Sequence, residues 1–254
     1  MRRLIALAFG PRVNVVVLGE RLRGAFGTLV GPERVHVVPN GLPDLGEGPP
    51  AAERKPIVLH LATMWSEKGL FDVLRAAVRV RDAFPEVRFV LAGGWYSDAE
   101  RRQALHFVQK HGLDRVIEFV GPVEDEAKRR LLQSASTLMF PSKVEGQPLV
   151  VVEALAAGTP VITTPVGSLP ETFDDAVEGF LVPRGDVEGL AGCCLTLLRD
   201  SALRSEMGQA ARRRYERYFQ AERFAQRLGD TIEALLETER PSTKRAEPPV
   251  IGVE

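Results

Sequence analysis

Short, continuous hydrophobic runs recur along the middle of this chain, and segments with helical periodicity separate them. The runs lie at residues 57–61, 87–91, 116–120, 137–140 and 161–164. A strand that is apolar at successive positions, rather than at alternate ones, is covered on both faces. Such strands belong to parallel sheets that carry helices on each side. The pattern therefore predicts an α/β fold built on a parallel sheet with helices on both faces.

The segments between these runs have the spacing of helices. Ser97 and Glu100 are spaced as a capping box at one helix start. Beyond residue 183 the pattern is helical only, so the fold is expected to end in a helical segment. The predicted helices lie at 68–84, 98–110, 125–135, 148–157, 187–198, 203–217 and 221–239.

Composition divides the chain into five parts. The first holds two β-branched runs, at 13–18 and 35–38, around a helix at 20–26. The second is rich in proline, glycine and charge, as linkers are. The last contains three prolines and few apolar side chains, as disordered tails do. The predicted parts are a small unit at 1–42, a linker at 43–56, the sheet domain at 57–200, C-terminal helices at 201–240 and a disordered tail at 241–254.

Charge and cysteine content restrict the class of protein. The formal net charge of −1 gives no electrostatic reason to expect nucleic acid as a partner. No apolar run approaches the ~20 residues that span a bilayer. Adjacent Cys193 and Cys194 are interpreted as small core residues of a helix in a reducing cytosol. A cytoplasmic location is therefore expected.

Several kinds of chemistry are excluded. No cluster of cysteine, histidine or carboxylate residues has metal-ligand spacing, so no metal site is predicted. His60 falls inside a predicted strand and is interpreted as a core residue. The sequence has neither a P-loop nor a nucleophile elbow, which excludes P-loop nucleotide binding and α/β-hydrolase chemistry.

The segment after the run at 137–140 holds the strongest candidate site, because parallel sheets bind ligands at the carboxyl ends of their strands. Gly146 lets a ligand approach the backbone, and Pro148 suits a helix start whose free N–H groups could hold a diphosphate. Glu153 interrupts a helix that is apolar almost all round. It either binds ribose hydroxyls or lies on a narrow exposed strip. Glu145 is either a ligand group or an ordinary loop acid.

Other strand ends add weaker candidates. Lys68 follows the run at 57–61 and is either a phosphate contact or a surface lysine. Gly93–Gly94 and Gly121–Val123 follow the next two runs and leave room for a ligand near the backbone. Their shared position at one edge of the sheet makes the group a candidate site.

Four segments together resemble the retaining glycosyltransferases of family 4, which have the two-domain GT-B architecture. They are Val37–Gly41, Glu67–Gly69, the block Glu145–Ile162 with its two glutamates Glu145 and Glu153, and Gly167–Glu171. The resemblance runs from about residue 13 to residue 225. It implies that the sheet domain is Rossmann-like and is the C-terminal, donor-binding half of such a fold.

The resemblance implies a role for each matching position. Glu145 would bind hydroxyls of the donor sugar, and Glu153 would bind the ribose. Lys68 would neutralise the diphosphate as the bond to the anomeric carbon breaks, which is electrostatic stabilisation without a metal or other cofactor. The backbone positions implied to hold the sugar and the diphosphate are Gly146, Gln147, Pro148, Leu149 and Val150. Those implied to flank the base are Gly121, Pro122 and Val123.

The chain departs from the family's pattern in three places. Thr63 stands where the family usually has an arginine beside the diphosphate, so some charge stabilisation is lost or comes from elsewhere. Gln147–Pro148 stands where the family often has an aromatic residue, which bears on donor-sugar preference. Most of the family's N-terminal acceptor domain is expected to be missing, with residues 1–42 as its remnant and a helix at 221–239 that packs back towards it.

The implied function is transfer of a hexose from a UDP- or GDP-sugar to a glycan or lipid-linked acceptor. The N-terminal domain could belong to a longer or separate chain, and a lipid-linked acceptor would place the reaction at the inner membrane face. The alternative is a module that binds a nucleotide sugar without transferring it, or an inactive fragment. Epimerases and phosphorylases share the architecture and form a third class.

Overall fold

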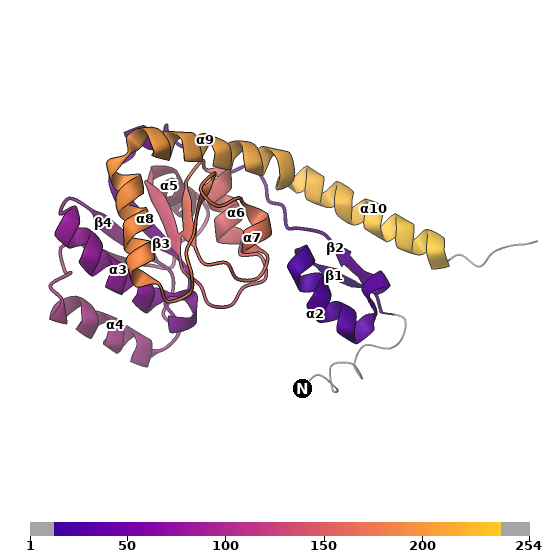
Figure 1. Cartoon of the computed structure of the whole chain (residues 1–254), viewed down its shortest axis with the longest axis horizontal. Helices are drawn as coiled ribbons and strands as arrows, with labels where there is room; N and C mark the ends of the chain where they lie inside the picture. The colour runs from indigo at the N-terminus through magenta and orange to yellow at the C-terminus, as the bar shows by residue number, and fades with distance from the viewer. Residues whose placement is uncertain (1–12, 240–254) are drawn as a thin grey trace, which may run out of the picture.

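The computed structural model describes residues 13–239, and its centre is one six-stranded sheet (Figure 1). The strand order is β5-β4-β3-β6-β7-β8, and every neighbouring pair is parallel. The chain order reverses between β3 and β6, so a topological switch point lies at their carboxyl ends. The strands are β3 (Ile57–Leu61), β4 (Arg88–Ala92), β5 (Ile117–Gly121), β6 (Thr137–Phe140), β7 (Val161–Thr163) and β8 (Gly179–Leu181).

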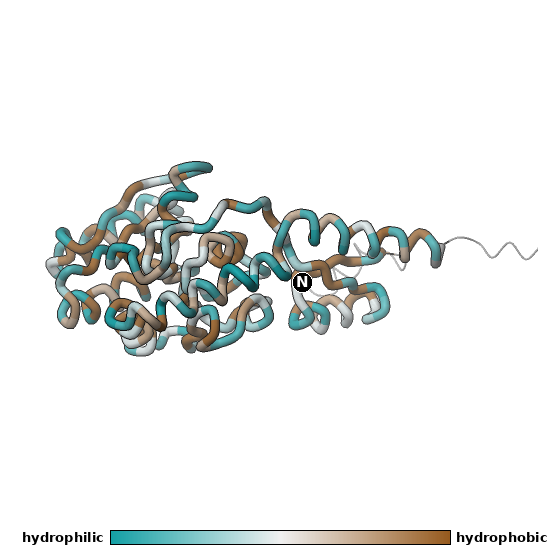
Figure 2. Tube along the Cα trace, turned by 90° about the horizontal axis from the view of Figure 1, so that it is seen from above, coloured by the Kyte–Doolittle hydropathy of each residue, from teal (hydrophilic) through white to brown (hydrophobic). Residues whose placement is uncertain are grey.

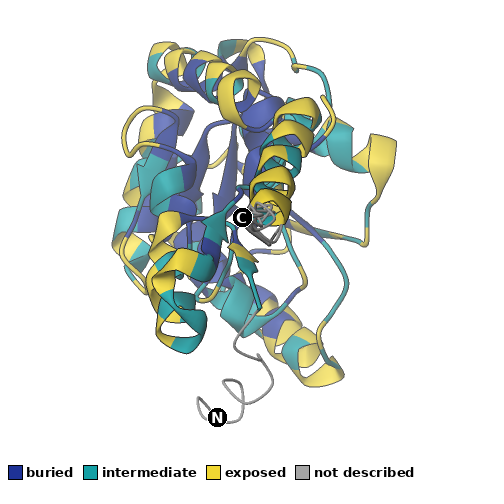
Figure 3. Ribbon diagram, turned by 90° about the vertical axis from the view of Figure 1, so that its right-hand side faces the viewer, coloured by how far each residue is buried: buried dark blue, intermediate teal, exposed yellow. Residues whose placement is uncertain are grey.

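Helices cover both faces of this sheet, which leaves the strands buried between exposed outer surfaces (Figure 3). The helices that build the core on one face are α3 (Leu70–Ala83), α4 (Asp98–Lys110) and α8 (Val187–Arg199). Those that build the core on the other face are α5 (Asp125–Ser134), α6 (Leu149–Ala156) and α9 (Ser201–Tyr218). Since α9 packs against both α6 and α8, it joins the two layers.

Successive strand residues point to opposite cores. In β3, Val58 lies in one core and Leu59 in the other, and in β4 Phe89 and Val90 divide in the same way. All four side chains are buried. Because side chains alternate across a strand, a sheet covered on both faces needs apolar residues at every position. This geometry explains the continuous runs in the sequence.

A smaller unit lies beside the sheet domain (Figure 1). Its strands β1 (Val15–Val17) and β2 (Val35–Val37) pair in parallel and are connected through α2 (Glu20–Val30) and the short η1 (Pro32–Arg34). The chain then enters the sheet domain, where Leu42 forms a bridge with Gln220. Two stretches of chain therefore lie side by side at this crossing.

The last described helix, α10 (Ala221–Glu239), begins at this crossing and extends past the small unit (Figure 1). Hydrophobic and hydrophilic positions alternate along its turns (Figure 2). Ile232 and Leu236 on this helix are exposed. The helix expected at 221–239 is confirmed at those residues.

The segment at 43–56 is irregular apart from η2 (Ala51–Glu53). Its Arg54 is buried and donates hydrogen bonds to Thr159 Oγ1 at 2.6 Å and to the Ala157 carbonyl at 2.8 Å. Burial lowers the pKa of Arg54 to about 10. A buried guanidinium needs such acceptors, so this arginine holds the segment against the end of α6.

The observed elements confirm the predicted sheet, its helices on both faces and the helical C-terminal segment. Several boundaries differ by one or two residues, and the helix predicted at 20–26 extends to Val30. The helix predicted from residue 68 begins at Leu70. A 3-10 turn, η3 (Ser66–Lys68), precedes it, and Gly69 has a positive φ of 83° between the two. The strand β8 and the short α7 (Leu169–Thr172) were not predicted.

Several predictions about single residues and segments can also be compared with the structure. Cys194 is buried on α8, Cys193 is half-buried, and burial raises the pKa of both thiols. His60 is fully buried, as expected for a core residue. Among the described helices, none has the length and hydropathy needed to cross a membrane. The tail predicted at 241–254 lies outside the described residues.

Candidate functional site

The loop after β6 leads into α6, the helix on which the candidate site was predicted. Pro148 has extended backbone angles and precedes the first helical residue, Leu149. No side chain caps this helix start, so its first N–H groups are open to an anion. The rest of α6 is buried around Val151, Val152 and Leu155. The helix is thus fixed in the core while its N-terminus faces the ligand edge of the sheet.

Glu145 and Lys68, both predicted as site residues, form an ion pair. Lys68 Nζ lies 2.7 Å from Glu145 Oε1, and the Glu145 side chain is only 9 % exposed. Two contacts bring the turn η3 to this loop. The Lys143 amide donates to the Glu67 carbonyl at 2.9 Å, and a Cβ at Gly69 would lie 2.3 Å from the Pro141 carbonyl oxygen. Only glycine permits this approach, so Gly69 positions Lys68.

Glu153 forms a second ion pair, with a residue that was not predicted from the sequence. Lys128 Nζ on α5 lies 2.5 Å from Glu153 Oε1. The Glu153 side chain is 12 % exposed, which rules out the narrow exposed strip considered above. A carboxylate this deep in an apolar helix needs donors, and Lys128 supplies one.

A hollow of about 400 Å³ opens above Glu153, at the carboxyl ends of β3 and β4. We call it the Glu153 hollow. The predicted site residues that line it are Thr63, Pro122, Val123, Leu149 and Glu153, together with Leu61, Ala62, Ala92, Gly93, Gly94 and Lys128. The structure therefore brings together positions from four separate strand ends, as the sheet topology predicted.

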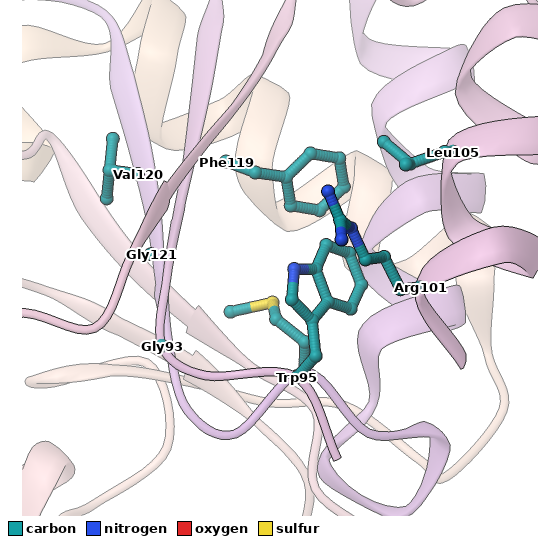
Figure 4. Close-up of a pocket in the computed structure, with 8 residues that line it drawn as sticks. Gly93, Trp95, Arg101, Leu105, Phe119, Val120 and Gly121 are labelled. Atoms are coloured by element: carbon teal, nitrogen blue, oxygen red, sulfur yellow. The ribbon is translucent and has the colours of Figure 1, made fainter. Parts of the chain in front are cut away.

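A neighbouring hollow of about 340 Å³ shares Gly93 with the first and is lined by Gly121 (Figure 4). Gly121 has a positive φ of 75°, and a Cβ there would meet nothing within 4 Å. In Figure 4, Trp95 and Phe119 point into this space, and their rings lie 5.0 Å apart. The predicted base-flanking segment Gly121–Val123 thus separates two hollows.

Glu145 itself faces a third hollow, of about 340 Å³, between its loop and α2. Arg21 and Leu22 line it from the small unit, and Val166 and Gly167 line it from the loop after β7. Gly167 has a positive φ of 56°, and a Cβ there would lie 2.3 Å from the Glu145 carbonyl oxygen. The loop that carries Glu145 is therefore packed tightly against the loop after β7.

Gln147, predicted to contact the donor, is occupied by other partners. Its side chain is buried, and its Oε1 accepts a hydrogen bond from the Asn40 amide at 2.7 Å. Its Nε2 donates to Thr172 Oγ1 at 3.3 Å. The Gln147 side chain thus joins the segment after β2, at Asn40, to α7.

Glu171, from the last resembling segment, caps α2. Its carboxylate accepts hydrogen bonds from the Glu20 amide at 2.6 Å and from the Arg21 amide at 2.7 Å. The α2 N-cap residue, Gly19, has no side chain to do this. A carboxylate from the sheet domain therefore holds the N-terminus of a helix in the small unit.

The arrangement has a clear chemical character. Carboxylates accept hydrogen bonds from hydroxyl groups, while lysine side chains and an uncapped helix start attract phosphate. Both kinds of group alternate around the start of α6. Within residues 13–239, no group of three or more histidine, cysteine or acidic side chains could hold a metal ion. The described site therefore suits a ligand that carries hydroxyls and phosphates together.

Comparison with known proteins identifies the family to which this chain is similar. Residues 46–214 match the family described as "Glycosyl transferases group 1". The chain is 30 % identical over 207 residues to the glycogen synthase of Mycobacterium tuberculosis, which covers 79 % of the chain and 49 % of that protein. It is 34 % identical over 154 residues to the phosphatidyl-myo-inositol mannosyltransferase of Mycobacterium leprae, covering 59 % of the chain and 39 % of that protein.

Solved structures agree in fold. Sucrose-phosphate synthase from Thermosynechococcus elongatus superimposes with a TM-score of 0.77 at 28 % identity, over 88 % of this chain and 58 % of that one. Anabaena HepE in complex with UDP and glucose gives a TM-score of 0.80 at 20 % identity, over 92 % of this chain and 66 % of that one. The chain spans about half the length of the curated relatives it matches. Since the family match covers most of its described residues, this chain belongs to the group 1 glycosyl transferases.

Proposed function

We propose that the chain supplies the donor site of a glycosyltransferase that transfers a hexose from a UDP- or GDP-sugar with retention of configuration. The observation that carries the proposal is Glu153. Its carboxylate lies inside an apolar helix, is 12 % exposed, and lines a hollow at the uncapped start of that helix. A buried acid beside an anion site fits a ribose that is joined to a diphosphate.

The proposed roles follow from the positions of the charges. The ribose hydroxyls donate to Glu153, and the diphosphate lies against the first N–H groups of α6. Lys68 neutralises charge on the diphosphate as it leaves the anomeric carbon. Its pairing with Glu145 sets the ammonium beside a carboxylate that can bind sugar hydroxyls. Positive groups fixed where negative charge develops are the usual source of such catalysis, and the proposed reaction needs no metal.

Relatives support the substrate class. Among them are a glycogen synthase and a mannosyltransferase, and the similar HepE structure is described as holding UDP and glucose. We propose a glycan or lipid-linked acceptor on this basis. The reaction would take place in the cytoplasm, at the inner membrane face if the acceptor is lipid-linked. The N-terminal acceptor domain would come from a longer or separate chain.

Calorimetric titration of the chain with UDP, GDP and ADP tests the donor site. We expect one nucleotide to bind and Glu153→Ala to weaken it at least about tenfold, because a buried charged hydrogen bond is lost. The matched control is Glu126→Ala on α5, whose carboxylate pairs with Arg129 and Arg130 on the surface. That control should bind as the wild type does.

Two results would count against the proposal. The donor site is refuted if none of the three nucleotides binds to the folded chain. Binding without release of nucleotide from any nucleotide sugar, in the presence of acceptors and of a protein that carries the N-terminal half, would instead support a non-catalytic binding module.

A further inference from the structure

Lys128 is the feature of the site that the proposed function has not used. It lies on α5, outside the segments that resemble the family, and its ammonium is 2.5 Å from Glu153 Oε1. The lysine side chain is 29 % exposed and reaches the pair from the surface of α5, whereas the Glu153 side chain is 12 % exposed. The pair therefore joins a more exposed cation to a more buried anion.

The charges around the Glu153 hollow consist of this pair alone. Among the described residues that line it, Lys128 is the only base and Glu153 is the only acid. Thr63 offers a hydroxyl but no charge, and Gly93 and Gly94 offer backbone only. Lys68 and Glu145 pair with each other outside this lining. The hollow is thus neutral as long as Lys128 and Glu153 hold each other.

A nucleoside diphosphate would disturb this balance. Its ribose hydroxyls need acceptors, and the oxygens of Glu153 are the acceptors that the proposed function assigns to them. Its phosphates need donors, and an ammonium has three N–H donors and no acceptor. If Lys128 exchanges Glu153 for a phosphate oxygen, both charges keep partners. If it stays, the diphosphate has no cation within this hollow.

We infer that Lys128 is a second diphosphate-binding cation besides Lys68, held by Glu153 in the empty site and transferred to the phosphates when ribose occupies that carboxylate. The inference rests on the proposed function, because it requires a nucleotide in this hollow. It makes Lys128 a donor-binding residue and explains how a site with a neutral Thr63 can hold two phosphates.

The test compares nucleosides with nucleoside diphosphates. The chain is titrated with UDP, GDP and ADP by calorimetry, and with uridine, guanosine and adenosine by calorimetry or by NMR where binding is weak. For the nucleotide that binds, the ratio of diphosphate to nucleoside affinity isolates the phosphate contribution. Lys128→Met should lower that ratio by about tenfold or more, the size of one lost hydrogen bond to a charged group.

Two further variants control for structure. Lys128→Gln can still donate to Glu153 but carries no charge, so it should lower the ratio as Lys128→Met does. Arg130→Met makes the same change of charge on the same helix, at a side chain that is 73 % exposed and pairs with Glu126. It should leave the ratio unchanged. Thermal unfolding checks that each variant is folded.

A rescue strengthens the test. Adding Thr63→Arg to Lys128→Met returns a cation to the same hollow and should restore most of the ratio. The inference is overturned if Lys128→Met and Lys128→Gln lower nucleoside and diphosphate affinity by the same factor, or if they lower neither affinity. In both cases the lysine would serve only to neutralise Glu153. If the wild type binds no nucleotide, the proposed function fails and the inference fails with it.

Discussion

His60 is a single buried side chain that makes the stability of the fold depend on pH. It lies in β3 and is fully buried, with its Nδ1 3.0 Å from the Met139 carbonyl oxygen. Its Nε2 is buried without a hydrogen-bond partner. Burial lowers the pKa of His60 to about 4. The imidazole therefore stays neutral in the folded protein under conditions in which the unfolded chain would bind a proton.

The pH dependence of stability follows from this difference. An unfolded histidine titrates near pH 6.5, so between about pH 6.5 and 4 unfolding takes up a proton and stability falls as the pH is lowered. We expect His60 to account for a loss on the order of 2 kcal/mol between about pH 7.5 and 5. Urea unfolding at both pH values should show a smaller loss in His60→Leu than in the wild type.

Exposed His106 on α4 provides the control, since His106→Leu should leave the wild-type pH dependence in place. Equal losses in all three proteins would show that His60 is not responsible.

Residue identity alone could predict some of these roles and not others. The partly buried Glu153 was identifiable as an acid in an apolar helix. Lys128 was not, because on α5 it looks like any surface lysine, and only the packing of α5 against α6 gives it a partner. The capping box is a similar case. Ser97 Oγ accepts from the Glu100 amide, but the Glu100 carboxylate accepts from Ser66 instead of returning to residue 97.

At the scale of elements, the loop after β7 supports the start of α6. The Ser168 amide donates to the Gly146 carbonyl at 2.8 Å, and Gly167 lies directly against Glu145. A side chain at residue 167 would have to displace the loop that carries the proposed sugar-binding carboxylate. Packing against the loop after β7 therefore fixes the position of the loop that carries Glu145.

We expect Gly167→Ala to weaken binding of the nucleotide sugar at least about tenfold, the size expected when one charge-assisted contact is lost. The positive φ should also lower stability by about 1–2 kcal/mol. Gly185→Ala is a matched control, because Gly185 has a φ of 78° but nothing within 4 Å of its Cβ position. Thermal unfolding should show a loss of stability in both variants, larger in Gly167→Ala because its Cβ also clashes with the Glu145 carbonyl oxygen, and calorimetry should show a loss of affinity only in Gly167→Ala.

Sequence patterns predicted the long elements well and missed the short ones. The strands β3 and β6 are central and apolar throughout, so their runs were clear. The strand β8 has three residues, and its Gly179 packs so closely on β7 that a Cβ would lie 2.0 Å from the Val161 carbonyl oxygen. The helix α7 has four residues, including Pro170. Neither is long enough to show a period.

At the scale of the whole molecule, Glu171 links the two parts of the chain. It caps α2 from α7, and Arg214 on α9 donates to the Glu171 carbonyl at 3.2 Å. The position of the small unit therefore depends in part on this carboxylate, together with the Gln147 hydrogen bond to Asn40 and the crossing at Leu42 and Gln220.

Replacing that carboxylate should loosen the small unit selectively. In Glu171→Ala, loss of the cap should cost α2 about 0.5–2 kcal/mol. Hydrogen exchange followed by mass spectrometry should then be faster in α2 and unchanged in β3 and β6. Glu20→Ala, which removes only the surface pair with Arg23, should exchange as the wild type does. Unchanged exchange in the Glu171 variant would show that the unit is held in other ways.

Gln147 combines two tasks that an engineer would want to separate. It lies in the proposed sugar-binding loop, yet its amide group holds the segment after β2 through Asn40 and α7 through Thr172. A mutant library that varies residue 147 to broaden the choice of donor sugar would also remove hydrogen bonds that connect the two parts of the molecule. Sugar selectivity and the connection between the two parts would change together in every member, and compensating substitutions at residue 40 or 172 would be needed to tell the two effects apart.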